Sequence, residues 1–199
     1  MKYNITYSDA QRYVWFRNAK CATRTTIKFL YENSDIKSGF PLNTGKDVGH
    51  GREYKQNWDE YFRFTIVRNP WDRLLSFYQN KLHNIQIEDT EFSIFKGCID
   101  FKKFVYAIKE RDLERCDGHF KLQSQMFPLD KIDFIGRFEN LQGDFNTVCD
   151  KIGIPQQQLP HENKTKHKHY TEYYDDETRQ IVAEKYAKDI EYFGYKFGE

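Results

Sequence analysis

A short segment near the N-terminus combines residue types that suit the binding of a phosphate or sulfate group. An apolar run ends at Asn18, Lys20 follows among small residues, and a helical pattern begins at Thr25. A helix start presents unpaired N–H groups and the positive end of its dipole, which together attract an anion. Lys20 adds a mobile positive charge, and hydroxyl donors follow it at Thr23, Thr25 and Thr26.

This segment contains no glycine. The fingerprint of nucleoside-triphosphate loops, G-x-x-x-x-G-K-[ST], is therefore absent although the residues suit an anion. Taken by itself, the segment has two interpretations: an anion-binding loop, or an ordinary strand-to-helix turn with a solvated lysine.

A second basic turn follows the apolar run 62–68, whose last residue is Arg68. The next residues, 69–72 (NPWD), break the run and open a helix that carries Ser76. A proline near the start and an aspartate in the first turn are typical helix-start signals. Asp72 and its neighbour Arg73 are expected to be helix-start and salt-bridge residues.

Strands and helices alternate along the chain, and this order positions both turns. We expect strands over 11–18, 62–68 and 132–136, and helices over 25–33, 73–82, 101–110, 141–152 and 176–193. Such alternation favours an α/β fold with a central parallel sheet flanked by helices. Open α/β sheets bind ligands beyond the carboxyl ends of their strands. Two turns side by side there can hold two separated anionic groups, as in an adenosine with a 3′-phosphate and a 5′-phosphosulfate.

Composition limits the classes of partner and location. The 199 residues fit one domain, 1–199, and the net charge of +1 indicates no bulk attraction to nucleic acid or anionic membranes. No apolar run approaches the ~20 residues that span a bilayer, and the N-terminus lacks the pattern of a signal peptide. We therefore expect a soluble, cytoplasmic protein with reduced thiols and no metal site. The four cysteines are Cys21, Cys98, Cys116 and Cys149.

Four segments resemble the carbohydrate-type, family 2-like sulfotransferases. Residues 18–23 (NAKCAT) are similar to the loop that binds the 5′-phosphosulfate, and 65–78 (TIVRNPWDRLLSFY) to the segment that binds the 3′-phosphate. The likeness continues through 133–141 (DFIGRFENL) and 170–197, so it covers nearly the whole chain. It implies a nucleotide-kinase-like (P-loop-type) fold and use of 3′-phosphoadenosine-5′-phosphosulfate (PAPS). One departure is Arg24, where relatives often have a small or hydroxyl residue.

The resemblance also implies site residues and a reaction. A sulfuryl group would pass from PAPS to an acceptor hydroxyl by in-line displacement without a metal, a glycan being the favoured acceptor. Lys20 would neutralise charge on the leaving phosphate. The expected donor-binding residues are Lys20, Cys21, Ala22, Thr23, Arg24, Thr25, Thr26, Arg68 and Ser76.

A histidine is expected to act as general base. His50, in a glycine-flanked loop, is the first choice, and this position resembles the histidine-based 2-O-sulfotransferase branch. His119 is the rival, with Gln123 as a candidate cleft residue; Glu53 is a further candidate base. The basic loop 164–168 is a candidate to close over the donor phosphates. The acceptor and the oligomeric state are left open.

Two other functions remain at this point. One is a nucleotide-dependent phosphotransferase on a related fold, which would require a glycine-rich loop and a magnesium carboxylate that the sequence does not show. The other is a non-catalytic nucleotide-binding module, against which the presence of Lys20 and His50 argues.

Overall fold

The computed structural model describes residues 2–36, 52–82, 95, 100–159 and 168–199 of the chain. Its contacts divide the chain into two compact units. The first unit comprises Met1–Val67 and Gln125–Lys164, and the second comprises Arg68–Ser124 and Thr165–Glu199. Each unit has its own hydrophobic core. The expectation of one domain over 1–199 stays a prediction.

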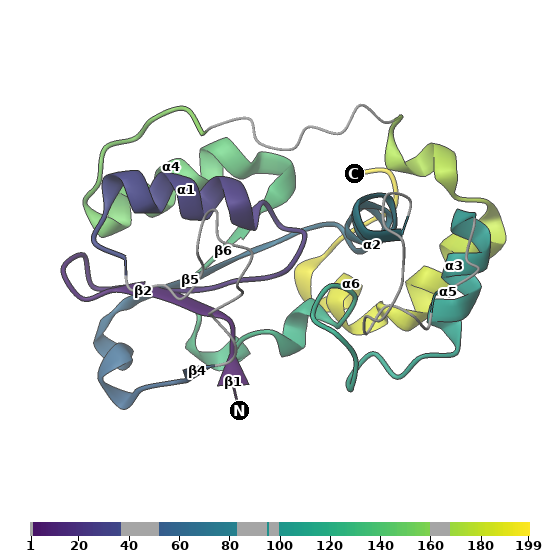
Figure 1. The fold of residues 1–199 in the computed structure, drawn as a ribbon, viewed down its shortest axis with the longest axis horizontal. Helices are drawn as coiled ribbons and strands as arrows, with labels where there is room; N and C mark the ends of the chain where they lie inside the picture. The colour runs from purple at the N-terminus through teal and green to yellow at the C-terminus, as the bar shows by residue number, and fades with distance from the viewer. Residues whose placement is uncertain (1, 37–51, 83–94, 96–99, 160–167) are drawn as a thin grey trace. The chain divides into compact units, whose positions relative to one another are not determined.

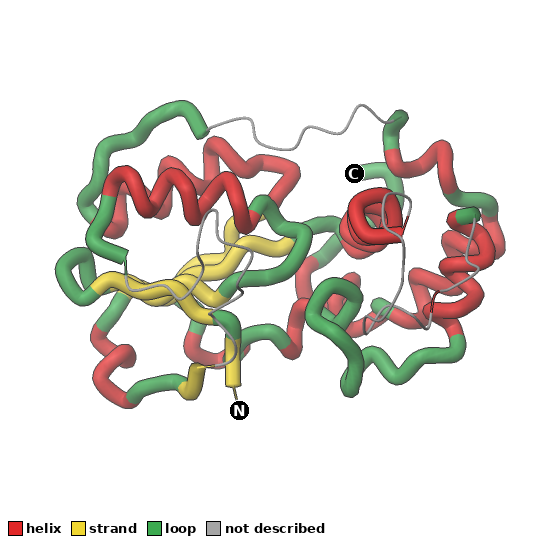
Figure 2. Tube along the Cα trace, in the orientation of Figure 1, coloured by secondary structure: helices red, strands yellow, loops and turns green. Residues whose placement is uncertain are grey.

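The first unit contains a four-stranded, mostly parallel sheet (Figure 2). Strand order is β2-β3-β5-β6, where β3 pairs with β5 and β5 with β6 in parallel, and β2 pairs with β3 antiparallel. The strands are β2 (Ile5–Ser8), β3 (Tyr13–Phe16), β5 (Phe62–Val67) and β6 (Phe134–Arg137). A separate two-stranded ladder joins β1 (Lys2–Tyr3) to β4 (Arg52–Glu53).

The prediction of a parallel sheet is confirmed for the three strands that carry the long apolar runs. The antiparallel β2 was missed, and the sheet is therefore mixed. The turn between β2 and β3 has neither glycine nor proline, although Arg12 in it adopts a left-handed φ of 50°. The sequence thus lacks the usual signal of a hairpin turn at the place where one forms.

Two helices, α1 (Thr23–Asn33) and α4 (Leu141–Ile152), cover one face of this sheet (Figure 1). Trp15 of β3 and Phe64 of β5 stack on that face, and Ile27 and Phe145 from the two helices belong to the same core. On the opposite face, the fully buried Trp58 of the 3₁₀-helix η1 (Gln56–Glu60) packs against Tyr7 of β2. α4 ends at Ile152, as the sequence predicts, and Gly153 follows in a left-handed conformation.

The second unit consists of helices around an aromatic core. They are α2 (Pro70–Phe77), which continues as a π-helical turn η2 (Tyr78–Leu82), α3 (Phe101–Lys109), the 3₁₀-turn η7 (Tyr170–Tyr173), α5 (Asp176–Lys185) and α6 (Ala187–Phe193). Asp175 caps α5 in a reciprocal capping box with Thr178. The single helix expected to reach Gly194 is interrupted at Tyr186, whose buried hydroxyl donates to the Phe120 carbonyl.

Short 3₁₀ segments connect the remaining elements: η4 (Gln123–Gln125), η5 (Leu129–Lys131) and η6 (Phe138–Asn140). Within the described residues, no helix combines the length and the apolar character needed to cross a bilayer.

Candidate functional site

The loop between β3 and α1 adopts a strained backbone without using glycine. Lys20 has φ 70° and Ala22 has φ 55°, both in the left-handed region. This region costs a residue with a Cβ about 1–2 kcal/mol, and such strain is concentrated at ligand-binding sites. Ala22 is the N-cap of α1 and offers no side-chain cap, and the first turn of α1 has no acidic residue. The first N–H groups of α1 are therefore left for an anion.

Asn18 fixes the base of this loop to the neighbouring strand. Its side chain is 1% exposed, and its Nδ2 donates to Thr65 Oγ1 (3.1 Å) and to the Ile66 carbonyl (3.0 Å). Thr23 Oγ1 donates to the Asn18 carbonyl (2.8 Å) and so closes the loop on itself. The Thr23 hydroxyl donor is therefore used within the loop. The contribution of Asn18 was missed in the sequence, where it marks only the end of an apolar run.

The other predicted residues of this loop differ in exposure. Cys21, Thr25 and Thr26 are buried, Lys20 and Ala22 are half-buried, and Arg24 is exposed. Thr26 Oγ1 has no hydrogen-bond partner among the described residues. The loop therefore presents Lys20 and Arg24 as cations, while Cys21 is a packing residue in this structure.

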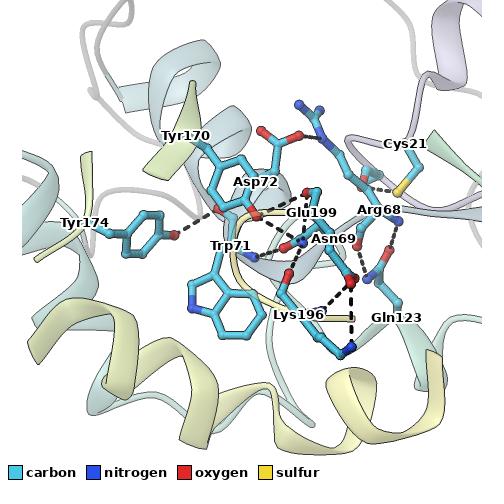
Figure 3. A network of polar contacts seen from close by, with 11 residues as sticks. Cys21, Arg68, Asn69, Trp71, Asp72, Gln123, Tyr170, Tyr174, Lys196 and Glu199 are labelled. Atoms are coloured by element: carbon cyan, nitrogen blue, oxygen red, sulfur yellow. Dashed lines mark hydrogen bonds and ion pairs between the residues drawn. The ribbon is translucent and has the colours of Figure 1, made fainter. Parts of the chain in front are cut away.

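In the second unit, Arg68 is a buried side chain with a fixed orientation (Figure 3). Its Nε donates to Asp72 Oδ2 at 2.8 Å, as the expected salt bridge. Gln123 holds the main chain of Arg68 from both sides: Oε1 accepts from the Arg68 N–H (2.9 Å) and Nε2 donates to its carbonyl (2.8 Å). Ser76 lies further along α2 and is half-buried.

Asn69 ties the start of α2 to the C-terminal segment. Its Oδ1 accepts from the Trp71 N–H (3.2 Å), and its Nδ2 donates to the Lys196 carbonyl (2.9 Å) and the Tyr170 hydroxyl (3.2 Å) (Figure 3). The Tyr174 hydroxyl donates to the Trp71 carbonyl (2.9 Å). The motif 68–72 is therefore a structural junction as well as a candidate binding segment.

His119 lies in an irregular stretch, residues 117–124, that we call the histidine segment. Its Nδ1 is 2.6 Å from Asp117 Oδ1, and its ring is 5.8 Å from that of Phe77. The side chain is 32% exposed. Burial by itself raises the pKa of the Asp117 carboxyl, but hydrogen bonds from His119 and from the main-chain N–H of Gly118 outweigh burial and lower that pKa. Asp117 is therefore ionised at neutral pH.

Some of the predicted site residues lie outside the described residues or are described only in part. His50 and residues 164–167 are outside the described residues, and Glu53 is described only as part of β4. Lys168 is exposed and pairs with Glu172 at 3.3 Å. In the parts of the chain that the structure describes, no three His, Cys, Asp or Glu side chains gather as metal ligands.

The sequence also matches the model of a known family over almost its full length. The model, Sulfotransfer_2, described as the sulfotransferase family, matches residues 3–196. The chain belongs to this family, and the resemblance to its carbohydrate-type members is confirmed.

Its relatives include carbohydrate sulfotransferases. Carbohydrate sulfotransferase 14 of Danio rerio is 27% identical over 169 residues, which cover 72% of this chain and 46% of that protein. Carbohydrate sulfotransferase 9 of Homo sapiens is 25% identical over 150 residues, which cover 65% of this chain and 33% of that protein. An uncharacterized protein of Archaeoglobus fulgidus is 26% identical over 109 residues, which cover 52% of this chain and 77% of that protein. The chain thus spans less than half the length of these carbohydrate sulfotransferases, and no solved structure matches it.

Proposed function

We propose that this chain transfers a sulfuryl group from PAPS to a hydroxyl group of a glycan. The observation that carries the proposal is the β3–α1 loop, which holds Lys20 beside an uncapped helix start and accepts left-handed strain at two non-glycine residues. Family membership supports sulfuryl transfer, and the printed names of the relatives support a carbohydrate acceptor. The nucleotide-kinase-like character of the fold is part of the proposal.

The 5′-phosphosulfate is assigned to the β3–α1 loop. The N–H groups at the start of α1 and the charge of Lys20 would stabilise the negative charge that grows on the leaving phosphate oxygen. Thr25 and Thr26 lie in the first turns of α1. Arg24 is exposed, and the first turn of α1 contains no carboxylate that would compete with an anionic ligand for it.

The 3′-phosphate is assigned to Arg68 and Ser76. A guanidinium group suits a phosphate because its N–H groups can bind two oxygens at once. Asp72 engages Nε of Arg68, and Gln123 fixes the main chain, so the side chain is oriented before any ligand arrives. Preorganisation of this kind lowers the entropy cost of binding.

The acceptor proton requires a base, which we propose to be a histidine. His50 stays the candidate from the sequence, and His119 is the candidate in the described residues. Comparing transfer by His50→Ala and His119→Ala variants, each with normal donor binding, separates the two.

The proposal is tested by titration calorimetry with 3′-phosphoadenosine-5′-phosphate (PAP) and with AMP, which lacks the 3′-phosphate. The native chain should bind PAP with micromolar affinity and more tightly than AMP. Arg68→Ala should weaken PAP binding about 100-fold, or about 2.7 kcal/mol, and abolish the preference over AMP. Arg115→Ala removes an exposed arginine of the same unit and is the matched control.

Each contrary result points to a different function. If the folded native chain binds ATP but not PAP, the phosphotransferase is favoured and the sulfotransferase proposal fails. Binding of PAP without transfer of labelled sulfate from PAPS to any member of an oligosaccharide panel would favour the non-catalytic module.

A further inference from the structure

The histidine segment has little regular secondary structure, yet buried polar side chains hold it on both sides of His119. Arg73, which is 1% exposed, donates to the carbonyls of Gly118 and Lys121, both at 2.8 Å. Burying an arginine is costly unless its donors are satisfied. Arg73 therefore holds the main chain on both sides of His119, at the carbonyls of Gly118 and Lys121.

The far end of the segment is held by a buried carboxylate. Asp189 of α6 is fully buried and accepts hydrogen bonds from the N–H groups of Gln123 (2.7 Å) and Ser124 (2.9 Å) and from the Ser124 hydroxyl (2.7 Å). Gln123 in turn holds the main chain of Arg68. Hydrogen bonds of Gln123 therefore connect the histidine segment to the proposed 3′-phosphate residue, Arg68, within the same unit.

Asp117 completes this arrangement at the imidazole itself. Its Oδ1 accepts from the main-chain N–H of His119 (2.9 Å) and lies 2.6 Å from Nδ1 of the ring. An ionised carboxylate can only accept a hydrogen bond, so the proton of a neutral imidazole is held on Nδ1. Nε2 then carries the lone pair, which is the form that a general base requires.

We propose that His119 is the general base of the transfer and that Asp117 is its positioning residue; this rests on the proposed function. As the acceptor oxygen bonds to sulfur, its proton passes to Nε2 of His119. The bond from sulfur to the bridging oxygen breaks, and its electron pair leaves on the 5′-phosphate of PAP. The carboxylate of Asp117 stabilises the imidazolium that forms.

Asp112 offers a matched control for the structural part of this contact. Its Oδ1 accepts from the N–H of Glu114 at 2.9 Å, the same side-chain to i+2 main-chain bond that Asp117 makes, without a histidine. Asp112→Ala and Asp117→Ala therefore remove equivalent turn contacts. Only the second removes the partner of an imidazole.

The tautomer is measured by ¹⁵N NMR on the full chain with labelled histidine, with His119→Gln used to assign the signal. In the native chain the proton should be on Nδ1, and Asp117→Ala should shift it toward Nε2, the tautomer that free histidine favours. Asp112→Ala should leave the tautomer unchanged. A native His119 protonated on Nε2 would overturn the proposal.

Transfer kinetics with PAPS and an oligosaccharide acceptor give the second readout. We expect Asp117→Ala to lower kcat about 100- to 1,000-fold, within the range of general-base effects, with KM for PAPS changed less than 3-fold by our estimate. The kcat of Asp117→Asn should lie between those of the native chain and Asp117→Ala, because the amide oxygen accepts the hydrogen bond from Nδ1 but carries no charge. The double variant with His119→Gln should be no slower than His119→Gln alone.

Two results would overturn the assignment while leaving the proposed function intact. The first is a kcat of Asp117→Ala equal to that of Asp112→Ala. The second is an Asp117→Ala/His119→Gln double variant whose kcat falls below that of His119→Gln by the same factor as Asp117→Ala lowers the native kcat. A folded native chain that neither binds PAP nor transfers sulfate would instead refute the proposed function, and the base assignment with it.

Discussion

Replacing Arg73 by methionine is expected to destabilise the protein strongly, although methionine fills a similar volume. The side chain is buried and donates to two main-chain carbonyls at 2.8 Å. A hydrogen bond to a charged group contributes about 1.5–3 kcal/mol, and each carbonyl left without a donor adds a desolvation cost. We therefore expect a loss of about 3–5 kcal/mol from the free energy of unfolding, out of the roughly 5–15 kcal/mol typical of a domain.

Urea unfolding followed by circular dichroism measures this loss as a shift of the midpoint at constant slope. Arg73→Lys keeps the charge but loses the planar fork, so it should lose about half as much. Arg12→Met is the control, because Arg12 and Glu60 form a surface pair with side chains 57% and 78% exposed, at 2.9 Å. Such pairs contribute at most about 1 kcal/mol. If Arg73→Met costs no more than Arg12→Met, the argument that buried donors hold the histidine segment is wrong.

Two further predictions concern the β3–α1 loop and the start of α5. Ala22→Val should cost about 1–3 kcal/mol in urea unfolding, because a β-branched residue is poorly tolerated at φ 55°, whereas Ala22→Gly should stay within about 1 kcal/mol of native; equal effects of the two would contradict the left-handed assignment. Hydrogen bonds from Lys102 and then from Thr178 lower the pKa of Asp175. The ionised carboxylate therefore stabilises the folded protein above the unfolded pKa of about 3.9, and this stabilisation is lost as the pH falls through the folded pKa. Unfolding midpoints from pH 7 to pH 3 should therefore fall less steeply in Asp175→Asn than in the native chain, and parallel curves would refute this.

Much of the fold follows from local patterns. The apolar runs predicted β3, β5 and β6, and the predicted helix end at residue 152 and helix start at residue 176 are both correct. The sequence did not predict strand β2, because this strand is short and the turn that follows it has no glycine or proline. Tertiary pairing with β3 decides that it is a strand.

The sequence predicted which residue types form the candidate site better than it predicted the role of each residue. The hydroxyl and basic residues after two strands indicated anion binding, and Asp72 was correctly expected in a salt bridge. Asp117 was not among the site residues predicted from the sequence. Its spacing from His119 was the available signal, since an aspartate commonly accepts from the N–H two residues on. His50 lies outside the described residues, so it stays an untested rival to His119 for the role of base, and cytoplasmic localisation stays a prediction.

The sequence by itself determined the family, the order of strands and helices, and the residue types that follow each strand. These depend on contacts between residues close in the chain, such as a cap with its first turn or an apolar stripe with its own helix. Only the tertiary structure decided that Arg73 holds Gly118, 45 residues away, and that Asp189 holds Gln123, 66 residues away. The free energy of a buried charge depends on which remote donors and carbonyls surround it, and that surrounding exists only once the chain has folded.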